Sequence, residues 1–161
     1  METIQIEIEM EDGGLMKGEL YPEAAPKTVE NFVKLCNQNF FEGLIFHRVI
    51  AGFMIQGGGM TADGKEKRTT PIKGEFDSNG VRNPLKHTRG VLSMARTMFP
   101  NSASSQFFIM HQDAPHLDGQ YAAFGRIVEG MEVVDAIAET PTDRQDRPLT
   151  DQVIREIRVV D

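Results

Sequence analysis

Three long polar side chains are candidates for chemistry because apolar and aromatic residues surround them in the sequence: Arg48, Gln56 and Gln106. Arginine and glutamine side chains that emerge from aromatic strands would line a concave pocket with an apolar floor and a polar wall. The same residues also fit an ordinary aromatic core with Arg48 as a surface or ion-paired arginine. Spacing alone leaves both interpretations open.

Other common catalytic constellations find no support in the sequence. The four histidines do not have the spacing of a zinc signature, and Cys36 is the only thiol. No Gly-Lys-Ser/Thr follows the glycines at 57–59, so they do not form a phosphate-binding loop. A Gly-x-Ser-x-Gly nucleophile elbow does not occur either. We therefore expect no metal and no cofactor at the site.

The segments that would carry the polar side chains are short apolar stretches typical of β-strands. Residues 3–10 alternate apolar and polar side chains, and the alternation resumes from Met16 after a glycine turn, which predicts an antiparallel hairpin. Further strands are predicted at 44–50, 53–56, 91–95, 106–110, 121–128 and 153–160. The polar stretch 61–83 predicts a long surface loop. This spacing of strands favours a barrel or a sandwich.

Two segments show helical periodicity instead. After Pro26, apolar residues recur at i, i+3, i+4 and i+7, which predicts an amphipathic helix that ends near residues 37–39. The inward positions of this helix are Val29, Phe32, Val33 and Cys36. A second, shorter helix is predicted from Met131 to Ala138.

The bulk composition predicts one soluble domain over residues 1–161. With 17 Lys and Arg against 24 Asp and Glu, the net charge is −7, so nucleic acid is not an expected partner. A single cysteine excludes an internal disulfide. The N-terminus has no signal-like apolar run, and no stretch reaches the ~20 apolar residues that a membrane span needs. We expect a cytoplasmic monomer.

Specific motifs then identify a family. Residues 46–58 resemble the FHR-x-x-x-GFM-x-QGG segment of cyclophilins. Further signatures of this family are similar to the sequence at 90–95, 105–109, 117–119 and 124–130. Residues 96–101 differ from the shorter stretch of familiar eukaryotic members and are similar to the form seen in bacterial relatives. The resemblance spans essentially the whole chain. It is to single-domain, bacterial-like members of the family.

The resemblance implies a mainly β fold, a closed eight-stranded antiparallel β-barrel capped by two α-helices, with the active site on its outer face. It implies peptidyl-prolyl cis/trans isomerase activity on X-Pro bonds of peptides and of unfolded or folding proteins. The implied catalytic residue is Arg48, which would stabilise the twisted amide, and Gln56 would orient it. The proline pocket would consist of Phe53, Met54, Phe108 and Leu117.

The remaining implied positions surround this pocket. Ala95 and Gln106 would border the neighbouring subsite, and His47 would lie at its rim. His116 stands where many cyclophilins carry the Trp that contacts cyclosporin, so we expect weakened affinity for that drug. Tyr121 stands where His is common and keeps a hydrogen-bonding tip on an aromatic ring.

Two alternative functions stay open at this stage. The first is a proline-peptide binding module or chaperone in which isomerase turnover is incidental. The presence of both Arg48 and Gln56 favours the enzyme, because pure binding needs only the apolar pocket. The second is a barrel that carries an apolar ligand in its lumen. Large inward candidates such as Phe32, Phe46 and Phe124 predict a filled interior instead.

Overall fold

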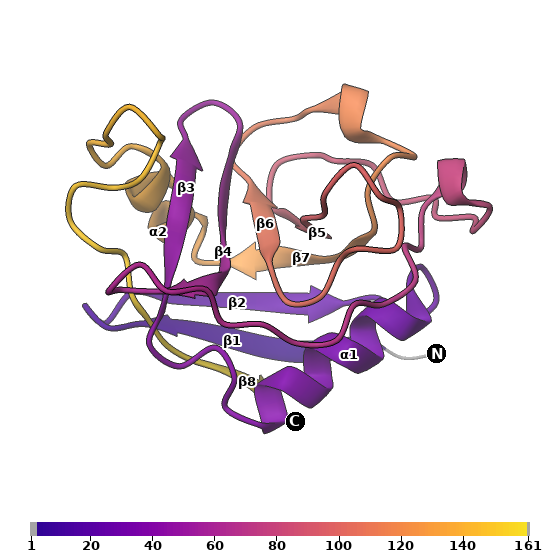
Figure 1. Ribbon diagram of the computed structural model, residues 1–161, viewed down its shortest axis with the longest axis horizontal. Helices are drawn as coiled ribbons and strands as arrows, with labels where there is room; N and C mark the ends of the chain where they lie inside the picture. The colour runs from indigo at the N-terminus through magenta and orange to yellow at the C-terminus, as the bar shows by residue number, and fades with distance from the viewer. Residues whose placement is uncertain (1–2, 161) are drawn as a thin grey trace.

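The computed structural model describes residues 3–160, so Met1, Glu2 and Asp161, which the predicted domain includes, lie outside the described residues. The strands are β1 (Ile4–Met10), β2 (Leu15–Leu20), β3 (Leu44–Ile50), β4 (Met54–Thr61), β5 (Val91–Met94), β6 (Phe107–Met110), β7 (Ala123–Glu129) and β8 (Ile154–Val160). The helices are α1 (Pro26–Asn37) and α2 (Met131–Ala138), and two short 3₁₀ turns are η1 (Asp77–Asn79) and η2 (Pro115–Leu117). Figure 1 shows their arrangement.

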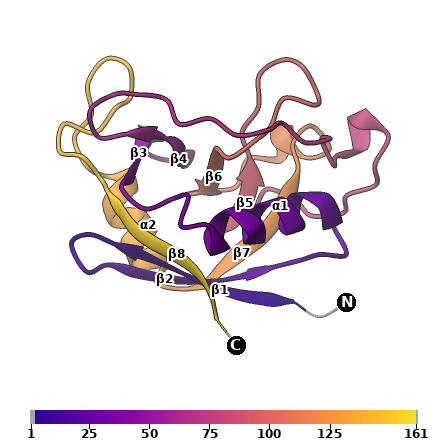
Figure 2. The same ribbon diagram turned by 60° about the horizontal axis from the view of Figure 1, so that its bottom comes forward.

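The eight strands form one strongly curled sheet in the order β3-β4-β6-β5-β7-β2-β1-β8. Every strand pair is antiparallel, which confirms the predicted architecture. Figure 2 shows β8 alongside β1. The edge strands β3 and β8 meet through an isolated bridge between Ile45 and Val153 and a bond from Phe46 N to Gln152 O. The barrel therefore closes over a short stretch and not through a continuous ladder.

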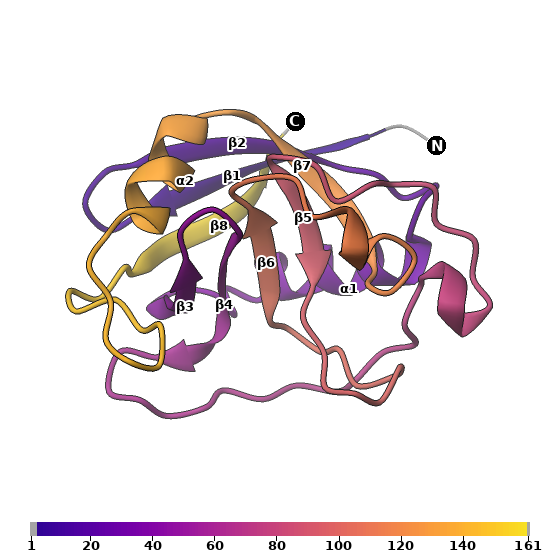
Figure 3. The same cartoon turned by 90° about the horizontal axis from the view of Figure 1, so that it is seen from above.

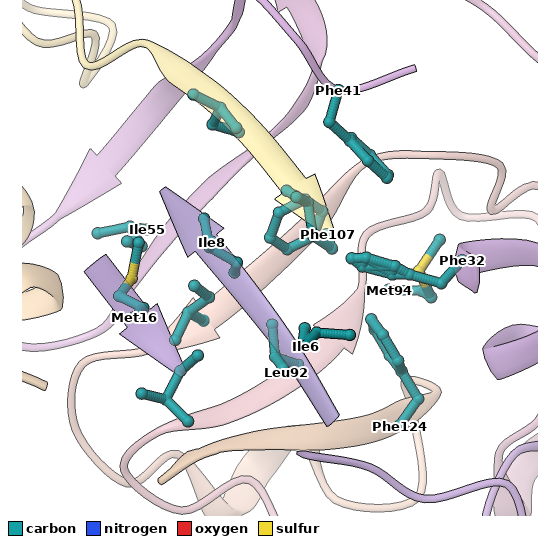
Figure 4. Close-up of a cluster of buried hydrophobic side chains, with 14 of the residues drawn as sticks. Ile6, Ile8, Met16, Phe32, Phe41, Ile55, Leu92, Met94, Phe107 and Phe124 are labelled. Atoms are coloured by element: carbon teal, nitrogen blue, oxygen red, sulfur yellow. The ribbon is translucent and has the colours of Figure 1, made fainter. Parts of the chain in front are cut away.

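The inside of the curled sheet is filled by large apolar side chains. Phe46, Phe107 and Phe124 are fully buried there, and the Phe32 ring from α1 lies 5.4 Å from that of Phe107. Figure 4 shows side chains from strands and helix converging on this centre. Alternating strand residues supply this core because successive side chains point to opposite faces of a sheet. The packed rings leave no support for a ligand carried in the lumen.

The two helices cover different ends of the sheet (Figures 1 and 3). Pro26 begins α1, where its missing N–H costs no helical hydrogen bond. Helix α2 buries Val134, Ile137 and Ala138 and packs against β2, β3 and β4. In residues 3–160, neither helix is long and apolar enough to cross a membrane.

The stretch 61–83 is not the simple surface loop that its polarity predicts. Phe76 is buried, and so are Glu75 and Asn83. The Glu75 carboxylate accepts hydrogen bonds from Thr28 N at 2.6 Å and Thr28 Oγ1 at 2.7 Å at the start of α1. Asn83 Nδ2 donates to Glu75 O and to Ala123 O. Glu75 and Asn83 therefore tie this stretch to α1 and to β7 in the interior. Their partners Thr28 and Ala123 lie far away in the sequence.

Strands β4 and β8 also differ from the prediction in informative ways. Strand β4 continues to Thr61, through the glycines at 57–59, whereas the apolar run ended at residue 56. In β8, Ile154 interrupts the alternation, and the register with β1 shifts between Glu9 and Met10, opposite this residue. A β-bulge of this kind restores Ile154 to the interior, where it is fully buried.

Phe32 provides a test of the core. Its ring contacts the rings of Phe41, Phe107 and Phe124. Phe32→Ala should lower the free energy of unfolding by about 3–5 kcal/mol, because it removes this buried ring and leaves a cavity. Urea denaturation measures the change. The matched control Phe99→Ala removes an exposed ring and should stay within about 0.5 kcal/mol of wild type. Equal losses in both variants would contradict the described core.

Candidate active site

The outer face of the sheet carries a row of site residues that strand register aligns. Arg48 of β3 lies opposite Gln56 of β4, Gln56 lies opposite Phe108 of β6, and Phe108 lies opposite Ser93 of β5. Residues directly opposite in an antiparallel pair share one face. The intervening residue Ile55 points into the core. The polar side chains that the sequence singled out therefore reach the surface from strands whose other face is the interior.

A cavity of about 190 Å³ lies over this row. It is lined by Arg48, Phe53, Met54, Gln56, Ala95, Arg96, Phe108, Leu117 and Tyr121. Eight of these nine residues were expected at the site, and Arg96 was not. A second cavity of about 200 Å³ adjoins the first and shares Gln56, Ala95 and Arg96 with it. Gln106 lines this second cavity.

The polar wall is a chain of three side chains. Arg48 Nη1 donates to Gln56 Oε1 at 3.3 Å, and Gln56 Nε2 donates to Gln106 Oε1 at 3.0 Å. Gly59 makes room for Gln106, since a Cβ at this glycine would lie 2.3 Å from Gln106 Cγ. Gln106 therefore fixes the amide of Gln56, and that amide in turn orients the Arg48 guanidinium.

The floor of the cavity is apolar and belongs to a second hydrophobic cluster outside the barrel. Met54, Phe108 and Leu117 are members of this cluster, and Phe53 and Tyr121 pack against it. The Tyr121 ring lies edge-on to Phe108 with centroids 5.7 Å apart. The cavity thus combines a preformed apolar surface with one cationic side, which suits a ligand that is apolar on one face and has a hydrogen-bond acceptor nearby.

Arg96 is the site residue that sequence reasoning missed. Its guanidinium lies 4.7 Å from the ring centroids of both Phe76 and Tyr121, and its Nε and Nη2 donate to Gln120 O. Cation–π contacts of this kind hold an arginine flat against aromatic faces. Its position directly after the signature segment 90–95 was an available signal, but the two ring partners are distant in sequence.

Two expected residues lie apart from the cavity lining. The exposed His116 stacks on the Phe53 ring with centroids 5.9 Å apart, so it supports the cavity from outside. His47 lines neither cavity. Burial, together with the charges of Arg147 and Arg48, lowers the pKa of His47, and its Nδ1 has no hydrogen-bond partner among residues 3–160. The His47 side chain is half-buried. It lies between the fully buried Phe46 and the exposed Arg48, where the register of β3 with β4 shifts.

Comparison with known proteins decides the family. Residues 4–159 match the family model of the cyclophilin type peptidyl-prolyl cis-trans isomerases. The chain belongs to the cyclophilin family. Its activity is therefore peptidyl-prolyl cis-trans isomerisation.

Bacterial isomerases are among the relatives of this cyclophilin. A peptidyl-prolyl cis-trans isomerase of Acinetobacter baylyi is 50% identical over 135 residues, which cover 80% of this chain and 69% of the relative. Peptidyl-prolyl cis-trans isomerase B of Escherichia coli is 43% identical over 152 residues, with 86% and 90% covered.

Among solved structures, a cyclophilin type isomerase of Cryptosporidium parvum superposes with a TM-score of 0.85 at 30% identity, covering 99% of both chains. A second crystal structure of that protein was determined in the presence of the dipeptide Ala-Pro and has a TM-score of 0.82 at 30% identity. It covers 98% of this cyclophilin and 99% of its own chain.

A buried polar network supports the floor of this cyclophilin's cavity from below. His87 Nδ1 lies 3.1 Å from Asp118 Oδ1, its Nε2 lies 2.8 Å from Ser93 Oγ, and its ring stacks on Phe108. Burial lowers the pKa of His87, against the opposing effect of the Asp118 carboxylate. A neutral ring satisfies both partners, since Nδ1–H donates to Asp118 and Nε2 accepts from the Ser93 hydroxyl. The network ties Leu117, through its neighbour Asp118, to β5.

The lowered pKa of His87 predicts a pH-dependent stability. Between the folded and the unfolded pKa values the unfolded chain binds more protons, so the free energy of unfolding falls as pH drops below about 6.5. His87→Gln removes the titrating ring and should flatten this dependence. Urea unfolding of both proteins between about pH 5 and 8 measures the two slopes. His47 contributes with the same sign and remains in both proteins. Identical slopes would contradict the assignment.

Proposed function

We propose that Arg48 accelerates isomerisation by binding the X-Pro amide more tightly when it is twisted than when it is planar. The supporting observation is the position of the guanidinium, held by Gln56 beside a cavity whose floor is apolar. In this proposal, Phe53, Met54, Phe108 and Leu117 hold the proline ring. The Ala-Pro dipeptide used with the Cryptosporidium relative is a fitting minimal probe for this chain.

The chemical problem is the partial double bond of the amide. Resonance shortens the C–N bond and sets a barrier of roughly 18–20 kcal/mol to rotation. Twisting removes the resonance, and lone-pair density returns to the proline nitrogen. A fixed cationic donor aimed at this nitrogen interacts with the twisted amide and much less with the planar one. This difference is the condition for catalysis, because equal binding of both states would leave the rate unchanged.

The surroundings of Arg48 suit this role. Within residues 3–160, its side chain bonds to the neutral Gln56 amide, so its charge is oriented without being neutralised by a carboxylate. A guanidinium has five N–H donors, and the bond to Gln56 uses one of them. A lysine would offer a mobile point charge in place of this rigid fork.

In this proposal, the apolar floor of the cavity also lowers the barrier to rotation of the amide. A twisted amide carries less charge separation than a planar one, so an apolar environment favours it. The pocket also holds the ring while the flanking chain rotates. Each tenfold of rate corresponds to about 1.4 kcal/mol, so a million-fold acceleration needs about 8 kcal/mol shared between Arg48 and the pocket. No nucleophile or cofactor is part of this proposal.

A second role, binding of unfolded clients, is favoured by one surface feature. Met98 and Phe99 are 86% and 69% exposed, in the loop that continues from the cavity-lining Arg96. Ser102 Oγ holds this loop by accepting from Thr97 N at 2.9 Å and donating to Phe99 O at 2.7 Å. A firmly held loop that displays two large apolar side chains beside the substrate cavity suits contact with apolar client segments.

The expectations on cyclosporin and on nucleic acid have separate grounds. His116 offers the Phe53 wall a smaller ring than Trp would, so we expect weakened cyclosporin affinity. The excess of acidic residues disfavours nucleic acid. A cytoplasmic location and a monomeric state are part of the proposal.

Substitution of Arg48 tests the catalytic proposal. Arg48→Ala should reduce kcat/KM on an Ala-Pro peptide by about a hundredfold or more, the effect typical of losing a transition-state donor. Arg48→Lys should recover only part of this loss, because it keeps the charge but not the fork. NMR exchange measures the rates, and thermal unfolding checks the fold. The control Arg82→Ala removes an exposed arginine outside the cavity and should leave the rate unchanged. A near wild-type rate in Arg48→Ala would refute the proposal.

The client-binding role has a separate test. The double variant Met98→Ser, Phe99→Ser should lose the ability to slow aggregation of an unfolded, proline-containing protein, since the apolar contact is gone. Its turnover of a short Ala-Pro peptide should stay at the wild-type level, because neither residue lines the cavities. Light scattering during refolding of the client measures the first property. Unchanged protection would argue against this second role.

A further inference from the structure

Phe53 lies in the turn between β3 and β4. Contacts with residues outside this turn hold the turn in its conformation. Phe53 N donates to Ile50 O at 3.0 Å, which closes a four-residue turn. Gly52, at the third position, has a φ of +82°, as a type II turn requires of that residue. The second position is Ala51, which does not fix φ as proline would. The turn itself therefore does little to preset the direction of the Phe53 ring.

His111, the residue directly after β6, clamps this turn from two sides. Its backbone N–H donates to Phe53 O at 2.9 Å. Its ring Nδ1 accepts from Gly52 N at 2.8 Å. The His111 side chain is 8% exposed, so the ring makes this bond away from bulk water.

The direction of the Gly52 bond identifies the tautomer of His111. A backbone N–H is always the donor, so Nδ1 carries no proton and a neutral ring carries its proton on Nε2. Nε2 lies 3.2 Å from Asp135 Oδ1 of α2, the geometry of donation to a carboxylate. Arg89 grips both oxygens of Asp135 at 2.7 and 2.8 Å and holds the pKa of this carboxyl below its usual value. Arg89 Nη1 also donates to His111 O.

We propose that His111 is a positioning residue for the proline site: its neutral Nε2–H form links α2 to the β3–β4 turn and thereby sets the Phe53 wall of the cavity. This inference rests on the proposed function, in which Phe53 contacts the substrate's proline ring. The acceptor on Nδ1 is the essential element, since a ring protonated on both nitrogens would turn a donor toward the Gly52 N–H. The Asp135–Arg89 pair fixes the ring that presents this acceptor.

A pair of substitutions separates the two ring nitrogens. Asn at position 111 places an amide group near the position of Nδ1 and retains an acceptor for Gly52. Gln places its amide near the position of Nε2 and retains the reach to Asp135. His111→Gln should weaken binding of an Ala-Pro peptide about fivefold, the effect of one lost hydrogen bond. His111→Asn should keep the dissociation constant within about twofold of wild type.

NMR titration of each variant with the peptide measures the dissociation constant, and the Phe53 ring resonances report the position of the wall. Thermal unfolding is recorded in parallel, because a merely structural role would lower the stability of both variants without separating their affinities. In the wild type, long-range proton–nitrogen spectra should show Nδ1 of His111 unprotonated and Nε2 protonated. The opposite tautomer would overturn the proposal.

The same titrations in an Arg48→Ala background make the outcomes distinguishable. Binding differences between the Asn and Gln variants that persist there support the His111 assignment, even if Arg48 fails as the catalytic group. If the peptide shifts the Phe53 resonances but binds the Asn and Gln variants with equal affinity, the His111 assignment alone is overturned. If the peptide leaves the Phe53 resonances of the wild type unmoved, the proline pocket and the inference drawn from it both fail.

Discussion

Strand β4 pairs with β3 on one side and with β6 on the other. This pairing determines which side chains of the three strands face the core and which face the cavity. Ile55 and Phe107 point into the barrel, whereas Gln56 and Phe108, one position further along each strand, line the cavity. A slip of one residue in either pairing would exchange these faces. The packing energy of the core therefore also enforces the placement of Arg48 opposite Gln56, and the site needs no separate stabilisation of its strands.

The charge at the cavity differs from the charge of the whole chain. The chain as a whole is acidic, yet two guanidinium groups, Arg48 and Arg96, line the cavity. Arg96 is held by carbonyl oxygens and aromatic faces, and Arg48 by a neutral amide. In the part of the chain that the structure describes, neither arginine is paired with a carboxylate. In the proposed mechanism, a guanidinium that is oriented but not neutralised is preorganised for charge that develops in the substrate.

Hydrogen bonds of buried polar side chains hold the loops around the cavity in fixed positions. Glu75 joins the long loop to α1, His87 joins the segment at Leu117 to β5, and His111 joins the β3–β4 turn to α2. Each of these groups has hydrogen-bond partners that compensate for its loss of water. Such bonds are directional, so they fix orientation where apolar packing alone would leave the loop several positions.

The sequence by itself determined the strands and helices with regular periodicity, the family, and the residues of the signature segments that line the cavity, from Arg48 to Leu117. These features are encoded over short stretches, where side-chain alternation and motif spacing act directly. Only the tertiary structure decided that Arg96 lines the cavity while His47 does not, that the 61–83 stretch is partly buried, and that β8 bulges at Ile154. Each of these outcomes depends on partners far apart in the chain, as with Thr28 and Glu75, and such contacts leave no local pattern.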